Sequence, residues 1–374
     1  MPSWLKEGRG SLCGANVSLL LREMGITKPL LVAGERTKNV FFARTGMRLP
    51  VFDAFHPNPD LQDCVAGAAL YQENDCDGLI SVGGGSAMDT AKGIKALLMT
   101  DIAHVRANQL PPEGKVPHLA IPGTAGTGAE TTAVAVLYED GQKLSVDHPA
   151  LLPDGVLLDG SLLDTLPEYH RKSCAMDALA QGIESWWAKK ATPGSRIHAE
   201  RAIRGVLDNL TAYLQGDRKA QDEMLHAAYE SGVAILTTRT TAAHAMSYQI
   251  TKKLGAAHGH ACMLTLPHLW AHLAAQAEYQ PMLTELAHIL GGEKPMDGAV
   301  LLKGLLAVLE LDKIPMPDDA TLDMLAASVN PERLGNHPEA LTTAQLRAIY
   351  VQAFTPMTDT ERAEAIAAWE QYGK

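Results

Sequence analysis

Four polar side chains in the second half of the sequence could together bind a metal ion. Asp177 and Gln181 are four residues apart in a segment of helical pattern, so both project from one face of a helix. His244 and His258 follow, the second in a glycine-containing stretch where a helix is expected to break. One carboxylate, one amide oxygen and two imidazoles suit a divalent first-row ion with open coordination positions. Each residue also has a structural interpretation, as a surface group or a hydrogen-bonded core histidine, and among 14 histidines a suggestive pair arises by chance.

A run of glycines in the first half could bind a phosphate group. Residues 83–86, Gly-Gly-Gly-Ser, lie between a predicted strand that ends at Val82 and a helix predicted from about Ala87. Backbone N–H groups approach a diphosphate closely where side chains are absent, and the helix N-terminus adds partial positive charge. The alternative is a purely structural helix start, in which Ser86 and Asp89 form a capping box.

A second segment rich in glycine and threonine, residues 121–132, again follows a predicted strand. In open α/β sheets, loops at the carboxyl ends of strands converge on one ligand-binding crevice. Two such loops favour a dinucleotide, because their hydroxyls could reach ribose or the nicotinamide amide, although neither has the GxGxxG pattern. A flexible surface loop is the alternative. The candidate cofactor contacts in the two segments are Gly84, Gly85, Ser86, Asp89, Thr124, Thr127 and Thr132.

Alternating strands and helices are predicted to position these loops. Apolar runs at 29–33, 78–82 and 118–121 are typical of buried strands, and helical patterns such as 87–98 lie between them. This alternation indicates a parallel sheet with helices on its faces. From about residue 164 the spacing is helical, for example at 200–214 and 221–234. We therefore predict an α/β nucleotide-binding domain at residues 1–163 and an all-α metal and substrate domain at residues 164–374.

The composition is that of a globular protein that acts on small molecules. Of 374 residues, 46% are hydrophobic and 20% charged, and a net charge of −11 leaves no basic face for a nucleic acid. No apolar run reaches membrane-spanning length, and residues 1–7 contain no apolar segment of signal-peptide length, so we expect no membrane partner and a cytoplasmic location. The five cysteines are scattered without CxxC spacing, which indicates reduced thiols rather than disulfides or a zinc knuckle.

Several motifs in the right order resemble the iron-containing (group III) alcohol dehydrogenase family. Residues 83–92 are similar to its diphosphate-binding pattern GGGSxxDxxK, and residues 122–130 to its PTTAGTGSE segment. Residues 158–179 match its strand-to-helix crossover, and the resemblance runs from about residue 10 to at least 270. It places His244 and His258 at two histidine ligands. It implies a dehydroquinate synthase-like N-terminal domain, a helical C-terminal domain, and a cleft between them where NAD(P)H delivers hydride and a divalent metal, usually iron, binds the substrate oxygen.

Three positions depart from the family pattern. Gln181 stands where members usually carry His, so it is a weak metal ligand or a neighbour of the ligands; we expect Fe²⁺, with Zn²⁺, Mn²⁺ or Ni²⁺ as alternatives. Tyr248 replaces a histidine often found ten residues before the last ligand. Gly34 replaces the aspartate that NAD-preferring relatives place at the end of the first nucleotide strand. The nearby Arg36 and Lys38 could accept a 2′-phosphate, which favours NADPH.

Residues 177–181 and 239–248 are most similar to the branch that contains phosphonoacetaldehyde reductases. This similarity implies a small aldehyde as substrate, with reduction of phosphonoacetaldehyde to 2-hydroxyethylphosphonate as the specific expectation. Arg239 could then hold the phosphonate, and an ordinary surface or salt-bridged arginine is the alternative. Tyr248 or His260 would protonate the alkoxide. Gly34 and Lys143 complete the predicted cofactor contacts, and relatives are commonly homodimers.

Two other functions stay open from the sequence. One is a cyclase or lyase of the dehydroquinate synthase type that uses NAD transiently, for which the motifs show little basic residue density apart from Arg239. The other is a non-catalytic nucleotide-binding homologue in which Gln181 marks a lost metal site.

Overall fold

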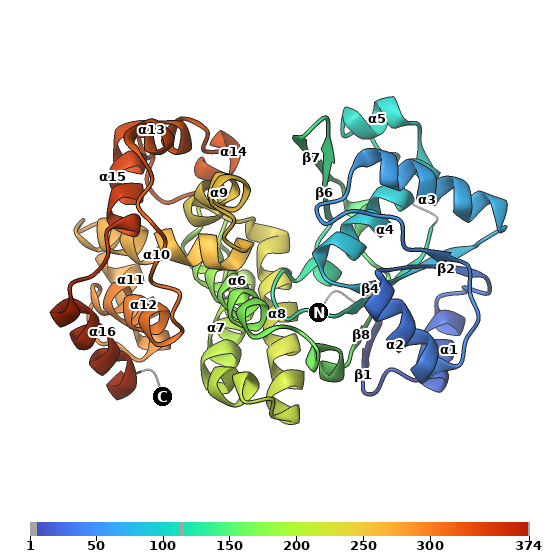
Figure 1. Ribbon diagram of the computed structural model, residues 1–374, viewed down its shortest axis with the longest axis horizontal. Helices are drawn as coiled ribbons and strands as arrows, with labels where there is room; N and C mark the ends of the chain where they lie inside the picture. The colour runs from blue at the N-terminus through green and yellow to red at the C-terminus, as the bar shows by residue number, and fades with distance from the viewer. Residues whose placement is uncertain (1–5, 113–115, 373–374) are drawn as a thin grey trace. The chain divides into compact units, whose positions relative to one another are not determined.

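The computed structural model describes residues 6–112 and 116–372 and divides the chain into two compact units (Figure 1). The first unit is Met1–Leu166 and the second Pro167–Lys374, whereas the sequence analysis places the boundary between residues 163 and 164. Residues 1–5, most of the segment considered for a signal peptide, lie outside the described residues.

The first unit is built on a six-stranded parallel sheet of order β1-β8-β5-β4-β2-β3. Its strands are β1 (Lys6–Arg9), β2 (Pro29–Ala33), β3 (Val51–Phe52), β4 (Gly78–Gly83), β5 (His118–Pro122) and β8 (Gly155–Leu158). The three predicted strands are confirmed as β2, β4 and β5, which lie side by side and are buried along their whole lengths.

Helices cover both faces of this sheet. Leu30 and Val32 of β2 belong to one apolar cluster, and Leu31 and Ala33 belong to another. One cluster is completed by α3 (Leu61–Glu73) and α4 (Gly85–Met99), and the other by α1 (Gly14–Glu23) and α2 (Glu35–Thr45). The two pairs lie on opposite sides of the sheet (Figure 1). Burial on both faces explains why these strands are continuous apolar runs instead of alternating ones. The short helix α5 (Ile102–Arg106) follows α4.

An antiparallel hairpin, absent from the sequence predictions, adds to the cluster beneath α3 and α4. It consists of β6 (Val134–Glu139) and β7 (Gln142–Asp147). Asp140 and Gly141 form its turn with φ of 50° and 72°, as a two-residue type I′ turn requires. Ala135 and Leu137 of β6 are buried in the cluster. Single 3₁₀ turns complete the unit: η1 (Ala129–Thr131), η2 (Pro149–Leu151) and η3 (Gly160–Leu163).

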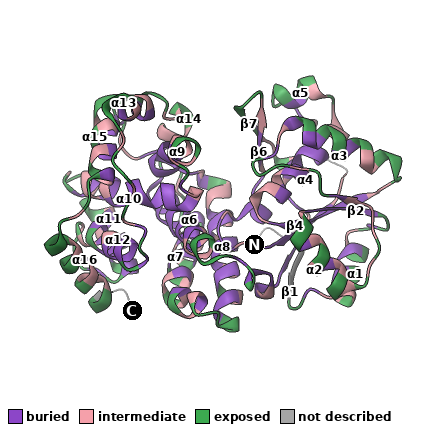
Figure 2. Ribbon diagram, viewed as in Figure 1, coloured by how far each residue is buried: buried purple, intermediate pink, exposed green. Residues whose placement is uncertain are grey.

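Helices are the only regular elements among the described residues of the second unit, which confirms the predicted all-α half. Its helices are α6 (Glu168–Trp187), α7 (Pro193–Leu214), α8 (Arg218–Thr238), α9 (Ala242–Gln249), the π-helical turn η4 (Ile250–Leu254), α10 (His258–Ala274), α11 (Gln280–Leu290), α12 (Asp297–Val308), α13 (Asp319–Ala327), α14 (Pro331–Leu334), α15 (Thr343–Phe354) and α16 (Asp359–Tyr372). Burial is concentrated in α6 and α10, whose long buried stretches form the centre of this unit (Figure 2). Among the described residues, no helix combines the length and apolar character needed to cross a membrane.

Candidate metal centre

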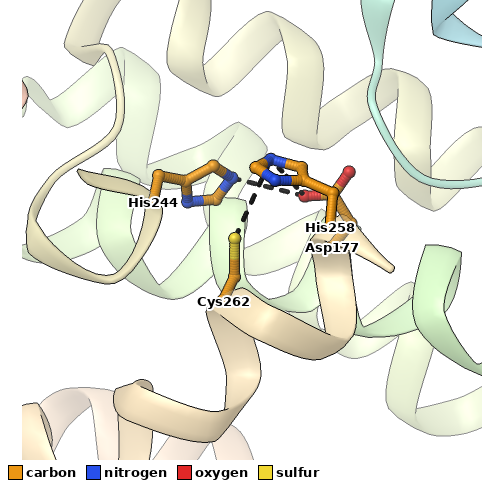
Figure 3. Close-up of side chains that lie close together, drawn as sticks. All are labelled: Asp177, His244, His258 and Cys262. Atoms are coloured by element: carbon orange, nitrogen blue, oxygen red, sulfur yellow. Dashed lines mark hydrogen bonds and ion pairs between the residues drawn. The ribbon is translucent and has the colours of Figure 1, made fainter. Parts of the chain in front are cut away.

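Four side chains of the second unit form a cluster of metal-binding type (Figure 3). Asp177 lies on α6, His244 on α9, and His258 and Cys262 on α10. One donor atom from each lies within 4.8 Å of all the others. Asp177 Oδ1 is 3.3 Å from His244 Nε2 and 3.9 Å from His258 Nε2. The structure thus brings together three of the four predicted ligands, and it adds Cys262, which the sequence analysis did not select.

A glycine lets α10 begin in direct contact with α6. A Cβ at Gly259 would lie 1.9 Å from the carbonyl oxygen of Ser173 and 2.7 Å from Cβ of Asp177, so no side chain fits there. His258 is the first residue of α10 and therefore lies beside Asp177. Cys262 follows one helical turn later, and its Sγ is 3.8 Å from His258 Nε2.

A buried carboxylate, Glu184 of α6, holds His244 in place. Its Oε1 accepts hydrogen bonds from the N–H groups of Thr241 and Ala243, at 3.1 and 2.9 Å, and from the Thr241 hydroxyl at 2.6 Å. Its Oε2 contacts His244 Nδ1, so the imidazole presents Nε2 to the cluster. N–H groups at the start of α9 therefore donate to the Glu184 carboxylate, at the end of the helix where the helix dipole favours negative charge. Sequence reasoning missed Glu184, although it lies seven residues after Asp177 on the same helix.

The charges of the cluster support one another. Burial alone would raise the pKa of Asp177, but His258 and His244 hold it below its ordinary value. Burial also opposes ionisation of Cys262, yet the two histidines lower the pKa of its thiol to about 7. The pKa of His258 is in turn raised to about 9, against the effect of burial, by Cys262 and Asp177. A divalent cation would replace the imidazole protons and balance the carboxylate and thiolate, so the residues present fit such an ion.

The fourth predicted ligand, Gln181, contacts the cluster through Asp177. Its Nε2 donates to Asp177 Oδ1 at 3.4 Å, and its Oε1 accepts from the Ser231 hydroxyl at 2.8 Å. The amide therefore directs its nitrogen, not its oxygen, toward the carboxylate.

The two predicted proton donors have different surroundings. The Tyr248 ring is stacked on that of His258, with centroids 6.0 Å apart and planes within 5°. His260 contacts the Tyr169 hydroxyl through Nδ1 at 3.1 Å and donates to the Leu311 carbonyl oxygen through Nε2 at 2.8 Å. Burial lowers its pKa. The structure therefore places Tyr248 against a cluster residue, while both nitrogens of His260 are used in packing α10.

Arg239, the predicted anion ligand, ends α8 in an unusual backbone conformation. Its φ of 62° and ψ of 178° are costly for a residue with a side chain. The buried Asn336 side chain donates to the carbonyl oxygens on either side of it, those of Thr238 at 2.7 Å and Thr240 at 3.1 Å. Five residues later comes His244. The segment between α8 and α9 is thus fixed at both ends, by Asn336 and by Glu184.

The predicted nucleotide-binding loops of the first unit lie against each other. Gly84 is the N-cap of α4 and no side chain caps this helix, so the structure does not contain the Ser86 and Asp89 capping box that was the alternative to a phosphate site. A Cβ at Gly84 would lie 3.1 Å from Thr124, and one at Gly85 would lie 3.5 Å from Thr127. The start of α4 therefore has a bare backbone beside two threonines, as a phosphate site requires.

A buried lysine ties α4 to the second loop. Lys92 is fully buried, and its Nζ donates to the carbonyl oxygens of Ala129 and Val134, at 2.7 and 2.9 Å, and to Thr132 Oγ1 at 3.1 Å. Two predicted cofactor contacts, Asp89 and Lys143, interact electrostatically with each other, and Asp89 also interacts with Lys92. Burial raises the pKa of Asp89 to about 6, although Lys92 and Lys143 oppose the rise.

The basic side chains expected to accept a 2′-phosphate already have partners. Gly34 is the N-cap of α2, directly after β2. Arg36 donates to the Thr165 hydroxyl, and the Lys38 ammonium is 2.6 Å from carboxylate oxygens of both Glu35 and Asp53. A phosphate at Lys38 would meet two carboxylates, which opposes the preference for NADPH inferred from the sequence.

Comparison with known proteins identifies the family. A model described as iron-containing alcohol dehydrogenase matches residues 3–160, and one described as the Fe-containing alcohol dehydrogenase family, C-terminal, matches residues 172–354. The NAD-dependent methanol dehydrogenase of Bacillus methanolicus is 30% identical over 75% of this chain and 77% of its own. The phosphonoacetaldehyde reductase of Streptomyces viridochromogenes is 35% identical over 57% of this chain and 58% of its own. The match to this relative thus spans less than two thirds of its length.

A solved structure extends the comparison to the whole fold. The sulfoacetaldehyde reductase of Bifidobacterium kashiwanohense, in complex with NAD⁺, has a TM-score of 0.85 and is 26% identical, covering 95% of this chain and 97% of its own. The chain belongs to the iron-containing alcohol dehydrogenase family and has its dehydroquinate synthase-like fold. It is an oxidoreductase of alcohols, in a family that uses NAD(P) and iron.

Proposed function

We propose that this enzyme uses NAD(P)H to reduce a small aldehyde that carries a tetrahedral oxyanion, with phosphonoacetaldehyde as the first candidate and 2-hydroxyethylphosphonate as its product. The main support for this substrate is the conformation and position of Arg239. Its backbone is held in a strained conformation by buried Asn336, five residues before His244 of the donor cluster. Strain of this kind persists where the surrounding structure enforces it and is concentrated at functional sites.

The relatives support this substrate class. Two of them are named for aldehydes with a phosphonate or a sulfonate group, and both groups present several oxygens to a hydrogen-bond donor. A guanidinium donates two parallel hydrogen bonds to such an oxyanion, which a lysine ammonium cannot reproduce.

The remaining residues divide the work of binding and proton transfer. Gly84, Gly85 and Thr127 would hold the diphosphate end of the cofactor, as their bare backbone and hydroxyl allow. Asp177, His244 and His258 would hold a metal ion, which supplies a Lewis acid for the carbonyl oxygen, while the nicotinamide supplies the hydride. Tyr248 is favoured over His260 as proton donor because it is stacked on His258. A homodimer and a cytoplasmic location stay predictions, and light scattering in solution would measure the former.

The test compares anionic and neutral aldehydes of similar size. Oxidation of NADPH and NADH is followed anaerobically with phosphonoacetaldehyde, sulfoacetaldehyde and butanal, for the wild type, Arg239→Gln and Arg239→Lys. Arg201→Gln, which removes an exposed arginine of α7, is the matched control. A lost charge-assisted hydrogen bond costs about 1.5–3 kcal/mol, so Arg239→Gln should raise KM for the anionic aldehydes about 10- to 100-fold and leave butanal unchanged.

Two results would overturn parts of the proposal. If only neutral aldehydes are reduced, the oxyanion substrate is wrong while the enzyme class stands. If Arg239→Gln and Arg201→Gln have equal effects on anionic substrates, Arg239 does not bind the oxyanion.

A further inference from the structure

We propose that Cys262 is a direct ligand of the metal ion, that Gln181 is not, and that the resulting site prefers zinc to iron. This inference rests on the metal-dependent function proposed above. It changes the donor set from carboxylate, amide and two imidazoles to carboxylate, thiolate and two imidazoles.

The spacing of the donors fits one small ion. Tetrahedral zinc has bonds of about 2.0 Å to nitrogen and oxygen and about 2.3 Å to sulfur, so its donors lie about 3.3–3.6 Å apart. The separations here are 3.3 Å for Asp177 Oδ1 to His244 Nε2 and 3.8 Å for Cys262 Sγ to His258 Nε2. The widest separation in the cluster is within 4.8 Å. The separation of 3.3 Å already fits a shared ion, those of 3.8 and 3.9 Å need shifts of a few tenths of an ångström, and rotation of short side chains would close any separation near the limit of 4.8 Å.

The orientations of the Cys262 and Gln181 side chains also indicate that Cys262, not Gln181, is the ligand. Cys262 is fully buried and lies one turn after His258 on the same helix, with its sulfur facing the cluster (Figure 3). Gln181 Oε1 instead accepts from Ser231, and its Nε2 donates to Asp177. Turning the amide over would bring its oxygen against the Asp177 carboxylate. In its present orientation the amide supports Asp177 without taking a coordination position.

The chemistry of the donors favours a borderline or soft ion. At a given site of nitrogen, oxygen and sulfur donors, Zn²⁺ binds more tightly than Fe²⁺, and thiolate, imidazole and carboxylate are all ligands that zinc takes. A carboxylate and a thiolate together carry the two negative charges that balance a divalent cation.

The test uses metal binding alone, so it does not depend on whether the aldehyde proposal is correct. Metal-free full-length protein is titrated with Co²⁺, and the near-ultraviolet absorption due to sulfur-to-cobalt charge transfer is recorded. The variants are Cys262→Ser and Gln181→Ala, with Cys76→Ser of the first unit as the matched cysteine control. Zn²⁺ and Fe²⁺ affinities are measured by competition with a chelator, and circular dichroism checks the fold of each variant.

We expect the charge-transfer band in the wild type, Gln181→Ala and Cys76→Ser, and its loss in Cys262→Ser. Residues that only orient ligands cost about 10- to 100-fold in metal affinity, so loss of a direct ligand should weaken Zn²⁺ binding about 100-fold or more. X-ray absorption of the zinc-loaded wild type should show one sulfur at about 2.3 Å, and this requires no variant to fold. We also expect the wild type to bind Zn²⁺ more tightly than Fe²⁺. Absence of sulfur from that shell, a band that persists in Cys262→Ser, loss of metal in Gln181→Ala alone, or tighter binding of Fe²⁺ than of Zn²⁺ would overturn the proposal.

Discussion

Replacing Glu184 by glutamine should weaken metal binding without unfolding the protein. The buried carboxylate accepts three close hydrogen bonds from Thr241 and Ala243 through Oε1, and contacts His244 Nδ1 through Oε2. Glutamine keeps one oxygen for the first set, which leaves its amide NH₂ facing Nδ1. The amide then donates to Nδ1 and forces the imidazole proton onto Nε2, the nitrogen that faces Asp177 and the other donors.

The size of the effect follows from the contacts. Loss of a group that orients a ligand histidine reduces metal affinity about 10- to 100-fold, which corresponds to about 1.4–2.7 kcal/mol. Glu184→Ala is a harsher change, because it leaves the three close donors buried without a partner at about 1–3 kcal/mol each. That sum approaches the whole stability of a typical domain, about 5–15 kcal/mol. We therefore expect Glu184→Ala to unfold readily and Glu184→Gln to fold.

The assay is competition for Zn²⁺ between metal-free protein and a chromogenic chelator, together with thermal unfolding of the metal-free form. Glu230→Gln is the matched control, because Glu230 pairs with His198 in the same unit and belongs to no donor cluster among the described residues. Equal Zn²⁺ affinity for the wild type and Glu184→Gln would refute the tautomer argument, as would equal losses in Glu184→Gln and Glu230→Gln.

Three further predictions concern pH, cofactor choice and helix packing. Burial lowers the pKa of His337 to about 4, so between about pH 6.5 and pH 4 the unfolded chain binds a proton that the folded chain does not, and the free energy of unfolding falls as the pH falls. From pH 7 to pH 5 this loss is about 2 kcal/mol, and urea unfolding should show it in the wild type but not in His337→Asn. Asp53→Asn removes one carboxylate from Lys38 and should raise the ratio of kcat/KM for NADPH over NADH several-fold; an unchanged ratio would show that Lys38 does not face the 2′ position. Gly259→Ala should force α10 away from Asp177, lower the free energy of thermal unfolding by about 1–3 kcal/mol and weaken Zn²⁺ binding. A variant that binds Zn²⁺ with wild-type affinity would contradict the packing argument.

The sheet could be predicted because burial on both faces makes its strands continuous apolar runs, and the helical half could be predicted because its long helices keep a regular spacing of apolar residues. β2, β4 and β5 are continuous apolar runs, and α7 and α8 keep helical spacing for more than twenty residues each. The hairpin of β6 and β7 carried a weaker signal, the Asp140-Gly141 turn, between strands that are only partly buried.

Asp177, His244 and His258 could be selected from the sequence because a family motif names their positions. Cys262 and Glu184 could not, although each lies on the same helix as a selected residue, four and seven positions away. Their roles depend on how closely α6, α9 and α10 approach one another, and that approach depends on Gly259. The pairing of Lys38 with Asp53 likewise arises only when β3 is placed beside β2.

The most direct test of the central claim is metal-dependent aldehyde reduction by the wild type and by His244→Ala. Protein stripped with a chelator is assayed anaerobically with NAD(P)H and phosphonoacetaldehyde or butanal, before and after addition of Fe²⁺ or Zn²⁺. We expect stripping to abolish turnover, an added ion to restore turnover in the wild type, and no ion to restore it in His244→Ala. Full turnover by His244→Ala, or by stripped wild type with chelator present, would contradict this claim.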